Sequence, residues 1–368
     1  MKVTFPHMGN LYVPLRTFFE NLGAEVVVPP FSSKRTLEIG CRYSPEFACL
    51  PLKVTLGNFI EALEMGADTI VMAGGMGPCR FGYYAEVQRE ILKDLGYDFN
   101  MIVLEPPQGH FWDFIKKFKY ITNKKSFKEI YLAGKLAWEK IIILDKLEKM
   151  VNHIRAVELE KGKTDKAYKK ALNLISNARD EQELAFARQQ IAKEISSIKK
   201  AKERNLLKVG LVGEIYTLLE PFVNFNIEKQ LCELGVLVER SIYISQWVRE
   251  NLLPSFMKSK EPEILAKLAE PYIPCFVGGH GRESVAQIVS YAKQGFDGVI
   301  HLLPLTCMPE IVAKSVLPMV SKIHSIPVMT LVLDEHSAEA GLRTRLEAFV
   351  DLIRKRKEEE EFGVLSWS

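Results

Sequence analysis

The sequence lacks a long apolar run, a strong net charge and any closely spaced pair of cysteines. No apolar stretch is long enough to cross a bilayer, and the opening MKVTFPHMGN lacks the apolar centre of a signal peptide. A formal net charge of +3 on 368 residues is too small to indicate a nucleic-acid or membrane partner. We therefore expect a cytoplasmic protein with neither kind of partner.

The absence of a CxxC pair bears on the six cysteines. A reducing compartment excludes a disulfide framework, so each cysteine is either a small buried hydrophobic residue or a ligand or nucleophile. Structural zinc sites favour closely spaced cysteine pairs, whereas widely spread thiolates suit an iron–sulfur cluster ligated from several loops. The spacing therefore favours an iron–sulfur cluster over zinc or copper(I).

Hydrophobic residues make up 47% of the chain, and their pattern repeats. An apolar strand at residues 2–5 leads to a helix ending at Gly23 and to a second strand, and the same order returns from residue 208, with the helix ending at Gly235. Later in each half, a Gly-x-Asp sequence (Gly66 to Asp68, Gly295 to Asp297) precedes an apolar strand and then a cysteine. This order predicts an internal duplication.

The strands are continuous apolar runs, which are typical of parallel sheets covered on both faces. We predict an α/β protein with two duplicated Rossmann-like parallel-sheet domains and a helical insertion between them. The middle segment is rich in Lys, Glu, Ala and Leu and has no proline from Ser126 to Asn205. The predicted domains are 1–123 and 207–354, with a helical segment at 124–206 and a charged tail at 355–368.

Four cysteines lie in loops beside glycine and proline. Cys41 and Cys49 belong to GCRYSPEFACLPLK, Cys79 to AGGMGPCRFGYY and Cys307 to LLPLTCMPEIVA. Cys79 and Cys307 each follow a predicted strand, where ligands bind in open α/β sheets. We predict that these four thiolates ligate an iron–sulfur cluster; for any one of them, burial as a small hydrophobic residue is the alternative. Cys232, at a helical position, is expected to pack in the core, and Cys275 is left open.

Two glycine-rich turns are the other candidate binding elements. Gly74, Gly75 and Gly77 allow close approach of the backbone to a cofactor, and Gly278, Gly279 and His280 form a turn before a helix that could hold an anion or phosphate. A single glycine-rich turn is common in α/β folds, and His280 could equally be a turn histidine bonded to the backbone. No catalytic residue is assigned.

The motif GCRYSPEFACLPLKVTLGNFIEALEMGADTIVMAGGMGPCRFGYY, with LLPLTCMPEIVA and DEHSAEAGLRTRLEAF, resembles the acyl-CoA dehydratase activase-related proteins. These are relatives of 2-hydroxyacyl-CoA dehydratase and benzoyl-CoA reductase subunits and of double-cubane cluster proteins. The resemblance implies Rossmann-like domains, an iron–sulfur cluster held in a cleft (4Fe-4S, with a double-cubane cluster as the alternative) and a partner activase that hydrolyses ATP. Cys41, Cys49, Cys79 and Cys307 match the cysteine positions of the family motifs. The ATP-binding signature of the activase itself is not recognisable in the sequence.

The resulting functional hypothesis is an iron–sulfur component that accepts low-potential electrons from a separate ATP-dependent activase, for reductive or dehydratase-type chemistry on a small-molecule or acyl-CoA substrate. The first alternative is a non-catalytic electron-transfer or cluster-assembly protein with a saturated 4Fe-4S cluster. The second alternative is an α/β enzyme that binds a nucleotide or sugar and uses its cysteines only for packing. Whether the chain is an enzyme, and whether it forms a dimer, is left open.

Overall fold

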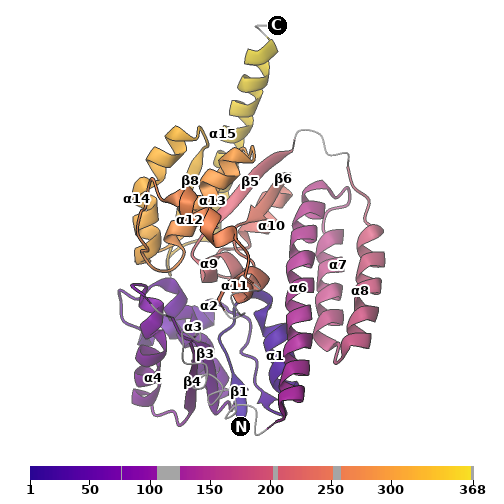
Figure 1. Cartoon of the computed structure of the whole chain (residues 1–368), viewed down its shortest axis with the longest axis vertical. Helices are drawn as coiled ribbons and strands as arrows, with labels where there is room; N and C mark the ends of the chain where they lie inside the picture. Colours follow the sequence, from indigo (N-terminus) through magenta and orange to yellow (C-terminus); the bar gives the residue numbers. More distant parts are fainter. Residues whose placement is uncertain (76, 106–124, 202–205, 252–257, 366–368) are drawn as a thin grey trace. The chain divides into compact units, whose positions relative to one another are not determined.

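The computed structural model describes residues 1–75, 77–105, 125–201, 206–251 and 258–365 (Figure 1). The chain forms two compact units. The first contains Met1–Lys146, Lys169–Glu194 and Tyr243–Ser259, and the second contains Leu147–Tyr168, Ile195–Ile242 and Lys260–Ser368. The predicted domain boundary between residues 123 and 124 lies outside the described residues.

The first unit is built on a four-stranded parallel sheet with the order β2-β1-β3-β4. Its strands are β1 (Lys2–Thr4), β2 (Glu25–Val26), β3 (Thr69–Ala73) and β4 (Asn100–Leu104). Its helices include α1 (Tyr12–Asn21), α2 (Lys34–Tyr43), α3 (Leu50–Glu64), α4 (Tyr84–Asp94) and α11 (Ile244–Asn251), with short 3₁₀ turns η1 (Gly9–Leu11) and η2 (Arg80–Tyr83). Apolar side chains of α3, α4 and β3 form its main core.

The second unit repeats this arrangement with the order β6-β5-β7-β8, again all parallel. Its strands are β5 (Leu207–Gly213), β6 (Val236–Arg240), β7 (Gly298–Pro304) and β8 (Val328–Leu333). Its helices include α9 (Ile215–Leu219), α10 (Ile227–Glu233), α12 (Glu261–Ala269), α13 (Gly281–Lys293), α14 (Met308–Ile323) and α15 (Glu339–Leu365). The prediction of two parallel-sheet α/β domains is therefore confirmed.

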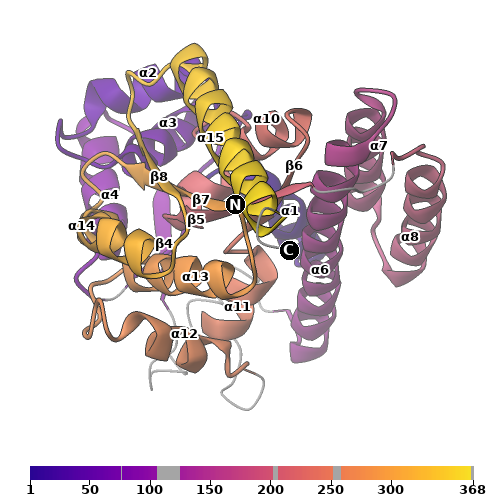
Figure 2. The ribbon, with the colours of Figure 1, turned by 90° about the horizontal axis from the view of Figure 1, so that it is seen from above.

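Adjacent residues of β7 show that both faces of the second sheet are covered. Val299 belongs to the core formed with α13 and α14, whereas a Cβ on Gly298 would meet Phe349 and Ile353 of α15. Successive side chains of a strand point to opposite faces, so α15 lies on the face opposite α13 and α14, as seen from above in Figure 2. Coverage on both faces explains why these strands are apolar throughout.

The two Gly-x-Asp sequences have the same structural role in the two units. Asp68 Oδ1 accepts a 2.8 Å hydrogen bond from the Lys2 backbone N–H, and Asp297 Oδ2 accepts one of 2.7 Å from the Lys208 backbone N–H. In return, each aspartate N–H donates to the same lysine's carbonyl oxygen, at 3.0 and 2.9 Å. These reciprocal bonds fix the start of β1 and of β5 in the same way, which supports the predicted repeat.

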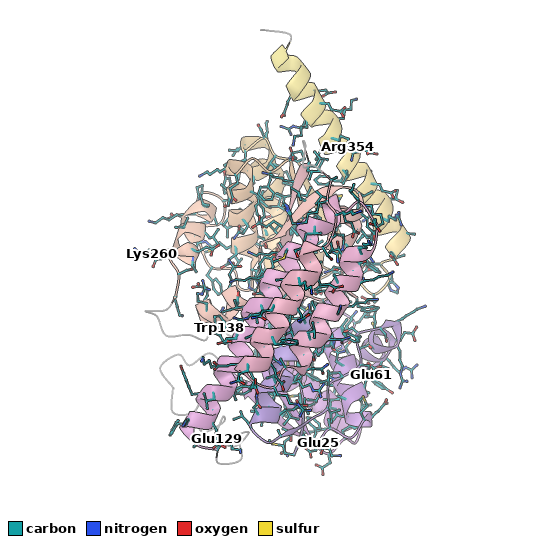
Figure 3. All side chains as sticks on the ribbon, turned by 90° about the vertical axis from the view of Figure 1, so that its right-hand side faces the viewer. Glu25, Glu61, Glu129, Trp138, Lys260 and Arg354 are labelled. Carbon is teal, nitrogen blue, oxygen red and sulfur yellow. The ribbon has the colours of Figure 1, made fainter. Side chains whose placement is uncertain are left out.

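The lysine- and glutamate-rich middle of the chain forms three helices, α6 (Phe127–Val157), α7 (Lys163–Asn177) and α8 (Glu181–Ser196), which Figure 3 shows with their side chains. Ion pairs between neighbouring helices include Lys135 with Glu181 at 2.6 Å. The charges are mostly on exposed faces, as predicted for a solvated helical segment. The charged tail continues α15 as far as Leu365.

Lys140 of α6 is a buried amine that provides a test of this packing. Its Nζ donates to Thr17 Oγ1 at 2.8 Å and to the Ser176 carbonyl oxygen at 3.2 Å, and burial lowers the pKa of Lys140 to about 8. A folded-state pKa below the unfolded value means that the buried charge costs stability below pH 8 and that this cost disappears as pH rises towards 10.5. We expect the stability of the wild type relative to Lys140→Met to increase between pH 7 and pH 10, measured by chemical denaturation at each pH; a constant difference would contradict it.

Candidate functional site

Cys49 and Cys79, two of the predicted cluster ligands, lie in the first unit, and each directly precedes a helical segment. Cys49 is the N-cap of α3 and Cys79 is the N-cap of η2, both with extended backbone and without a side-chain cap bond. The Cys49 side chain is buried, and its Sγ is hydrogen-bonded to the hydroxyl of Tyr84. Cys49 therefore stands at the start of a 15-residue helix, a position that suits a reactive or ligating thiol, whereas the segment after Cys79 has only four residues.

The Gly74–Gly77 turn follows β3 directly. A Cβ on Gly74 would lie 2.6 Å from Glu105 Cγ, and one on Gly75 would lie 2.6 Å from Cδ1 of Phe81. Gly77 has φ +100°, a conformation that favours glycine. The two close approaches at Gly74 and Gly75 are therefore made by side chains of the same unit. Binding of a cofactor by this turn stays a prediction.

The remaining cysteines differ in exposure. The prediction that Cys41 lies in a loop was wrong, because Cys41 lies within α2, where it is half-buried. Cys307 is the buried N-cap of α14, and Cys275 is exposed. Cys232 is fully buried, its Sγ donates to the Asn152 carbonyl oxygen at 3.2 Å, and burial raises its pKa to about 12, so the predicted core role of Cys232 is confirmed. Within the described ranges, no three His, Cys, Asp or Glu side chains are grouped so that they could hold a metal ion.

The carboxyl end of the second sheet contains a buried pair that sequence reasoning missed. His301 lies in β7 and Glu310 in the first turn of α14; both are fully buried, and Nε2 of His301 is 2.8 Å from Oε2 of Glu310. Nδ1 of His301 lies 3.3 Å from the hydroxyl of Thr330 on β8. The other carboxylate oxygen of Glu310, Oε1, is buried and has no hydrogen-bond partner among the described protein atoms.

Three further titratable side chains, Glu214, His280 and Glu283, interact electrostatically with Glu310 of this pair. Glu214 directly follows β5 and caps α9, accepting bonds of 2.9 Å from the backbone N–H groups of Tyr216 and Thr217. Burial raises the pKa values of Glu214 and Glu283, and the charge of Glu310 raises both further. Burial lowers the pKa of His280, against a smaller opposing effect of Glu310.

We call Glu214, Glu283 and Glu310, together with His280 and His301, the acidic cluster. It lies at the carboxyl ends of the adjacent strands β5 and β7, from which the chain continues to β6 on one side of the sheet and to β8 on the other; this is the ligand-binding position of an open α/β sheet. Side chains with shifted pKa values in such a place are typical of binding or proton-transfer sites. The predicted turn residues Gly278, Gly279 and His280 lead directly into it, and Gly278 (φ +86°) and Gly279 (φ +48°) are both left-handed.

The sequence contained a weak signal for the acidic cluster. A histidine stands in the middle of the apolar strand GVIHLLP, and a glutamate follows in the first turn after CMP. A titratable side chain inside a buried strand needs a hydrogen-bond partner. For the histidine of this strand, the glutamate in the first turn of the following helix is a candidate partner.

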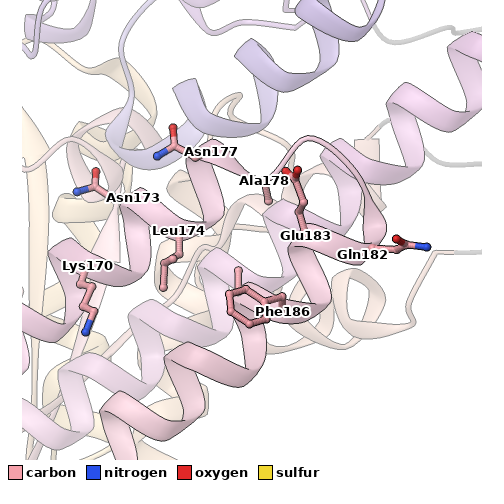
Figure 4. Close-up of a pocket in the computed structure, with 9 residues that line it drawn as sticks. Lys170, Asn173, Leu174, Asn177, Ala178, Gln182, Glu183 and Phe186 are labelled. Atoms are coloured by element: carbon pink, nitrogen blue, oxygen red, sulfur yellow. The ribbon is translucent and has the colours of Figure 1, made fainter.

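A pocket of about 520 Å³ lies on α7 and α8 (Figure 4). Leu174, Ala178 and Phe186 supply its apolar lining. The two charged residues that line the pocket already have partners in this helical segment. Lys170 forms an ion pair with Glu194 at 2.7 Å, and Glu183 accepts a hydrogen bond from the Arg179 backbone N–H at 2.7 Å. We assign no reaction to this pocket.

Part of the chain matches a known family model. Residues 7–73 match the family model described as "CoA enzyme activase uncharacterised domain (DUF2229)". No curated protein matches the chain. The match supports an activase-related family for this chain. Among the described helices, none has both the length and the apolar character needed to cross a membrane.

The functional hypothesis from the sequence was wrong. It made the chain an iron–sulfur component that receives electrons from a separate activase, whereas the family match gives the activase description to a segment of this chain. The prediction of a separate activase as the partner was wrong for the same reason. The cysteine spacing could not separate the two roles, because the positions of thiols along the chain do not show what the protein does with them.

Proposed function

We propose that this chain is an activating protein for a CoA enzyme, and that its partner belongs to the 2-hydroxyacyl-CoA dehydratase and benzoyl-CoA reductase superfamily. In this proposal the chain docks on the CoA enzyme and, although the usual ATP-binding signature is not recognisable in its sequence, uses ATP to bring that enzyme into its active form. The observation that carries the proposal is the match of residues 7–73 to a CoA enzyme activase domain.

The matched segment builds the binding end of the first sheet. It begins at His7, just beyond β1, and ends at Ala73, the last residue of β3, and β1 and β3 are paired neighbours. Both ends of the segment therefore lie at the carboxyl ends of the two central strands, where α/β proteins bind ligands. His7 is buried there, stacked on Tyr12 with ring centroids 5.4 Å apart.

Exposed aromatic side chains beside this end supply a surface for the partner. Phe47, between α2 and α3, is 75% exposed, and Tyr83, in η2, is 73% exposed. Arg80 of η2 donates from Nη1 to the Phe47 carbonyl oxygen at 3.0 Å, which joins the two loops. Exposed aromatic residues and arginine are typical of protein-binding surfaces.

The first test is ATP hydrolysis by the purified chain, alone and with a purified 2-hydroxyacyl-CoA dehydratase, together with the turnover of that dehydratase. We expect the dehydratase to turn over only when the chain and ATP are both present. The absence of both ATP hydrolysis and dehydratase activation would overturn the proposal.

The docking surface gives a second test. We expect the double variant Phe47→Ala and Tyr83→Ala to activate the dehydratase at least about tenfold less well, because truncating central aromatic residues of an interface typically costs about 2 kcal/mol or more. Phe127→Ala, at a position that is 67% exposed on α6, is the matched control and should activate normally. Equal loss in the control would show a general effect on folding instead of docking.

The iron–sulfur cofactor stays a prediction, and the described thiols give no grouping that would hold it. Cys41, Cys49 and Cys79 belong to the first unit and Cys307 to the second. We therefore derive no reaction step through a cluster. Iron and acid-labile sulfide are measured after anaerobic purification: Cys79→Ala should lose most of the iron, and Cys232→Ala should keep it because that thiol is in the core. Protein without iron and sulfide would contradict the cofactor prediction.

A further inference from the structure

The pocket on α7 and α8 is a groove between two neighbouring helices of the first unit. Only residues 178–180 separate the two helices, and so short a connection makes them antiparallel neighbours. One stripe of each helix lines the groove, with members about one helical turn apart: Asn173, Leu174 and Asn177 on α7, and Gln182, Phe186 and Ala187 on α8. Two antiparallel helices that both turn such a stripe outwards have the form of one half of a four-helix bundle.

An exposed aromatic ring and an apolar hollow lie next to each other on this face (Figure 4). Phe186 of α8 is 59% exposed, whereas Ala178 and Ala187 are small and buried and leave a hollow of about 520 Å³. Leu174 of α7, which is half-buried, lines the other side. In a two-fold symmetric interface the same patch of both copies meets. A surface that carries a projecting side chain beside a hollow that can receive it is therefore complementary to itself.

The charges of this face also fit a second copy of the same face. Nζ of Lys170 lies 2.7 Å from Oε2 of Glu194, so these two residues stand at the same height on the two helices. If two copies meet about a two-fold axis parallel to the helices, α7 of each copy lies over α8 of the other. Lys170 then faces the partner's Glu194, and the reverse contact is made on the other side of the axis. Opposite charges therefore meet across the interface, which is the electrostatic complementarity that specific association requires.

We propose that the outer face of α7 and α8 binds a second copy of this chain, with Phe186 of each copy in the pocket of the other. The helices have 15 and 16 residues, so each is about 23 Å long, and together they present roughly 500 Å² per copy. A standard interface buries roughly 800 Å² per partner, so we expect a reversible dimer with a Kd in the micromolar range. This inference does not depend on the proposed function.

The test is analytical ultracentrifugation of the full chain across the micromolar concentration range, where we expect the wild type to pass from monomer to dimer. Phe186→Glu should raise the Kd of the dimer at least about a hundredfold, because each dimer loses the ring twice and one central aromatic residue is typically worth about tenfold or more. Phe127→Glu, at a position that is 67% exposed on α6, is the matched control and should dimerise as the wild type does.

A mixing experiment identifies the occupant of the groove as a second copy. Because Phe186 itself lines the pocket that receives its counterpart, both copies of this residue lie close to the two-fold axis. Phe186→Glu and Phe186→Lys should therefore each be monomeric alone, since like charges meet, and an equimolar mixture should regain the dimer. Phe186 is exposed, so both variants should fold, which circular dichroism checks.

Three results would overturn the proposal: a wild type that stays monomeric throughout, a dimer that both Phe186 variants retain, or a mixture of the two variants that stays monomeric. A monomeric wild type that binds a purified 2-hydroxyacyl-CoA dehydratase, together with loss of this binding in Phe186→Glu, would assign the groove to that enzyme and not to a second copy.

Discussion

Replacing Gly40 or Gly57 by alanine is expected to destabilise the first unit by about 3 kcal/mol or more, at the upper end of what overpacking a core costs. A Cβ on Gly40 of α2 would lie 1.8 Å from the Lys53 carbonyl oxygen, and one on Gly57 of α3 would lie 2.0 Å from that of Thr36. The two contacts are one helical turn apart on each helix, as antiparallel packing requires. Because both obstacles are backbone atoms, the helices must separate to admit a methyl group.

Gly134→Ala is the matched control for these variants. Gly134 lies inside α6, and its nearest neighbour to a new Cβ is Cε2 of Phe18 at 4.0 Å, an ordinary contact. Alanine there should stabilise the helix by roughly 0.5–1 kcal/mol. Chemical denaturation followed by circular dichroism measures all three variants. Equal effects at Gly57 and Gly134 would show that α2 and α3 are not in close contact.

The two sheets could be predicted because their signals are local and repeated. Continuous apolar strands, glycines at helix ends and the two Gly-x-Asp sequences each determine a short piece of backbone, and the bonds from Asp68 and Asp297 show the repeat in atomic detail. Agreement between such signals in both halves is what makes a fold readable from one sequence.

The candidate site was less predictable, because it depends on which loops meet. The loop context of Cys49 and Cys79 indicated thiols at strand ends, and both are helix caps there, but spacing along the chain gives no distance between sulfur atoms. The His301–Glu310 pair arises from a strand and a helix that pack at one point. A resemblance carried by cysteine motifs also could not distinguish an activase from the enzyme that it activates.

Arg240→Met is expected to cost about 3–5 kcal/mol at neutral pH, which is the loss typical of removing one partner from a buried ion pair. The Arg240 side chain is only 4% exposed, and its guanidinium bonds Oε2 of Glu148 at 2.6 Å and Oε2 of Glu228 at 3.1 Å. Its Nε also donates to the Ile242 carbonyl oxygen at 2.8 Å. Methionine fills a similar volume, so the loss measures the two carboxylates left without their cation and not a cavity.

The pH dependence of this loss separates the charge effect from packing. Burial raises the pKa of Glu228 even with Arg240 present, and removing the cation raises it further. Because the pKa of Glu228 is higher in the folded than in the unfolded state, protonation of Glu228 at low pH increases the free energy of unfolding. This increase is lost as pH rises through the folded-state pKa. The deficit of Arg240→Met should therefore be smaller at pH 5 than at pH 7 in chemical denaturation. Arg343→Met removes the exposed pair with Glu347 and should cost at most about 0.5 kcal/mol at either pH. A deficit for Arg240→Met that is independent of pH would mean that lost packing, and not the unpaired carboxylates, causes it.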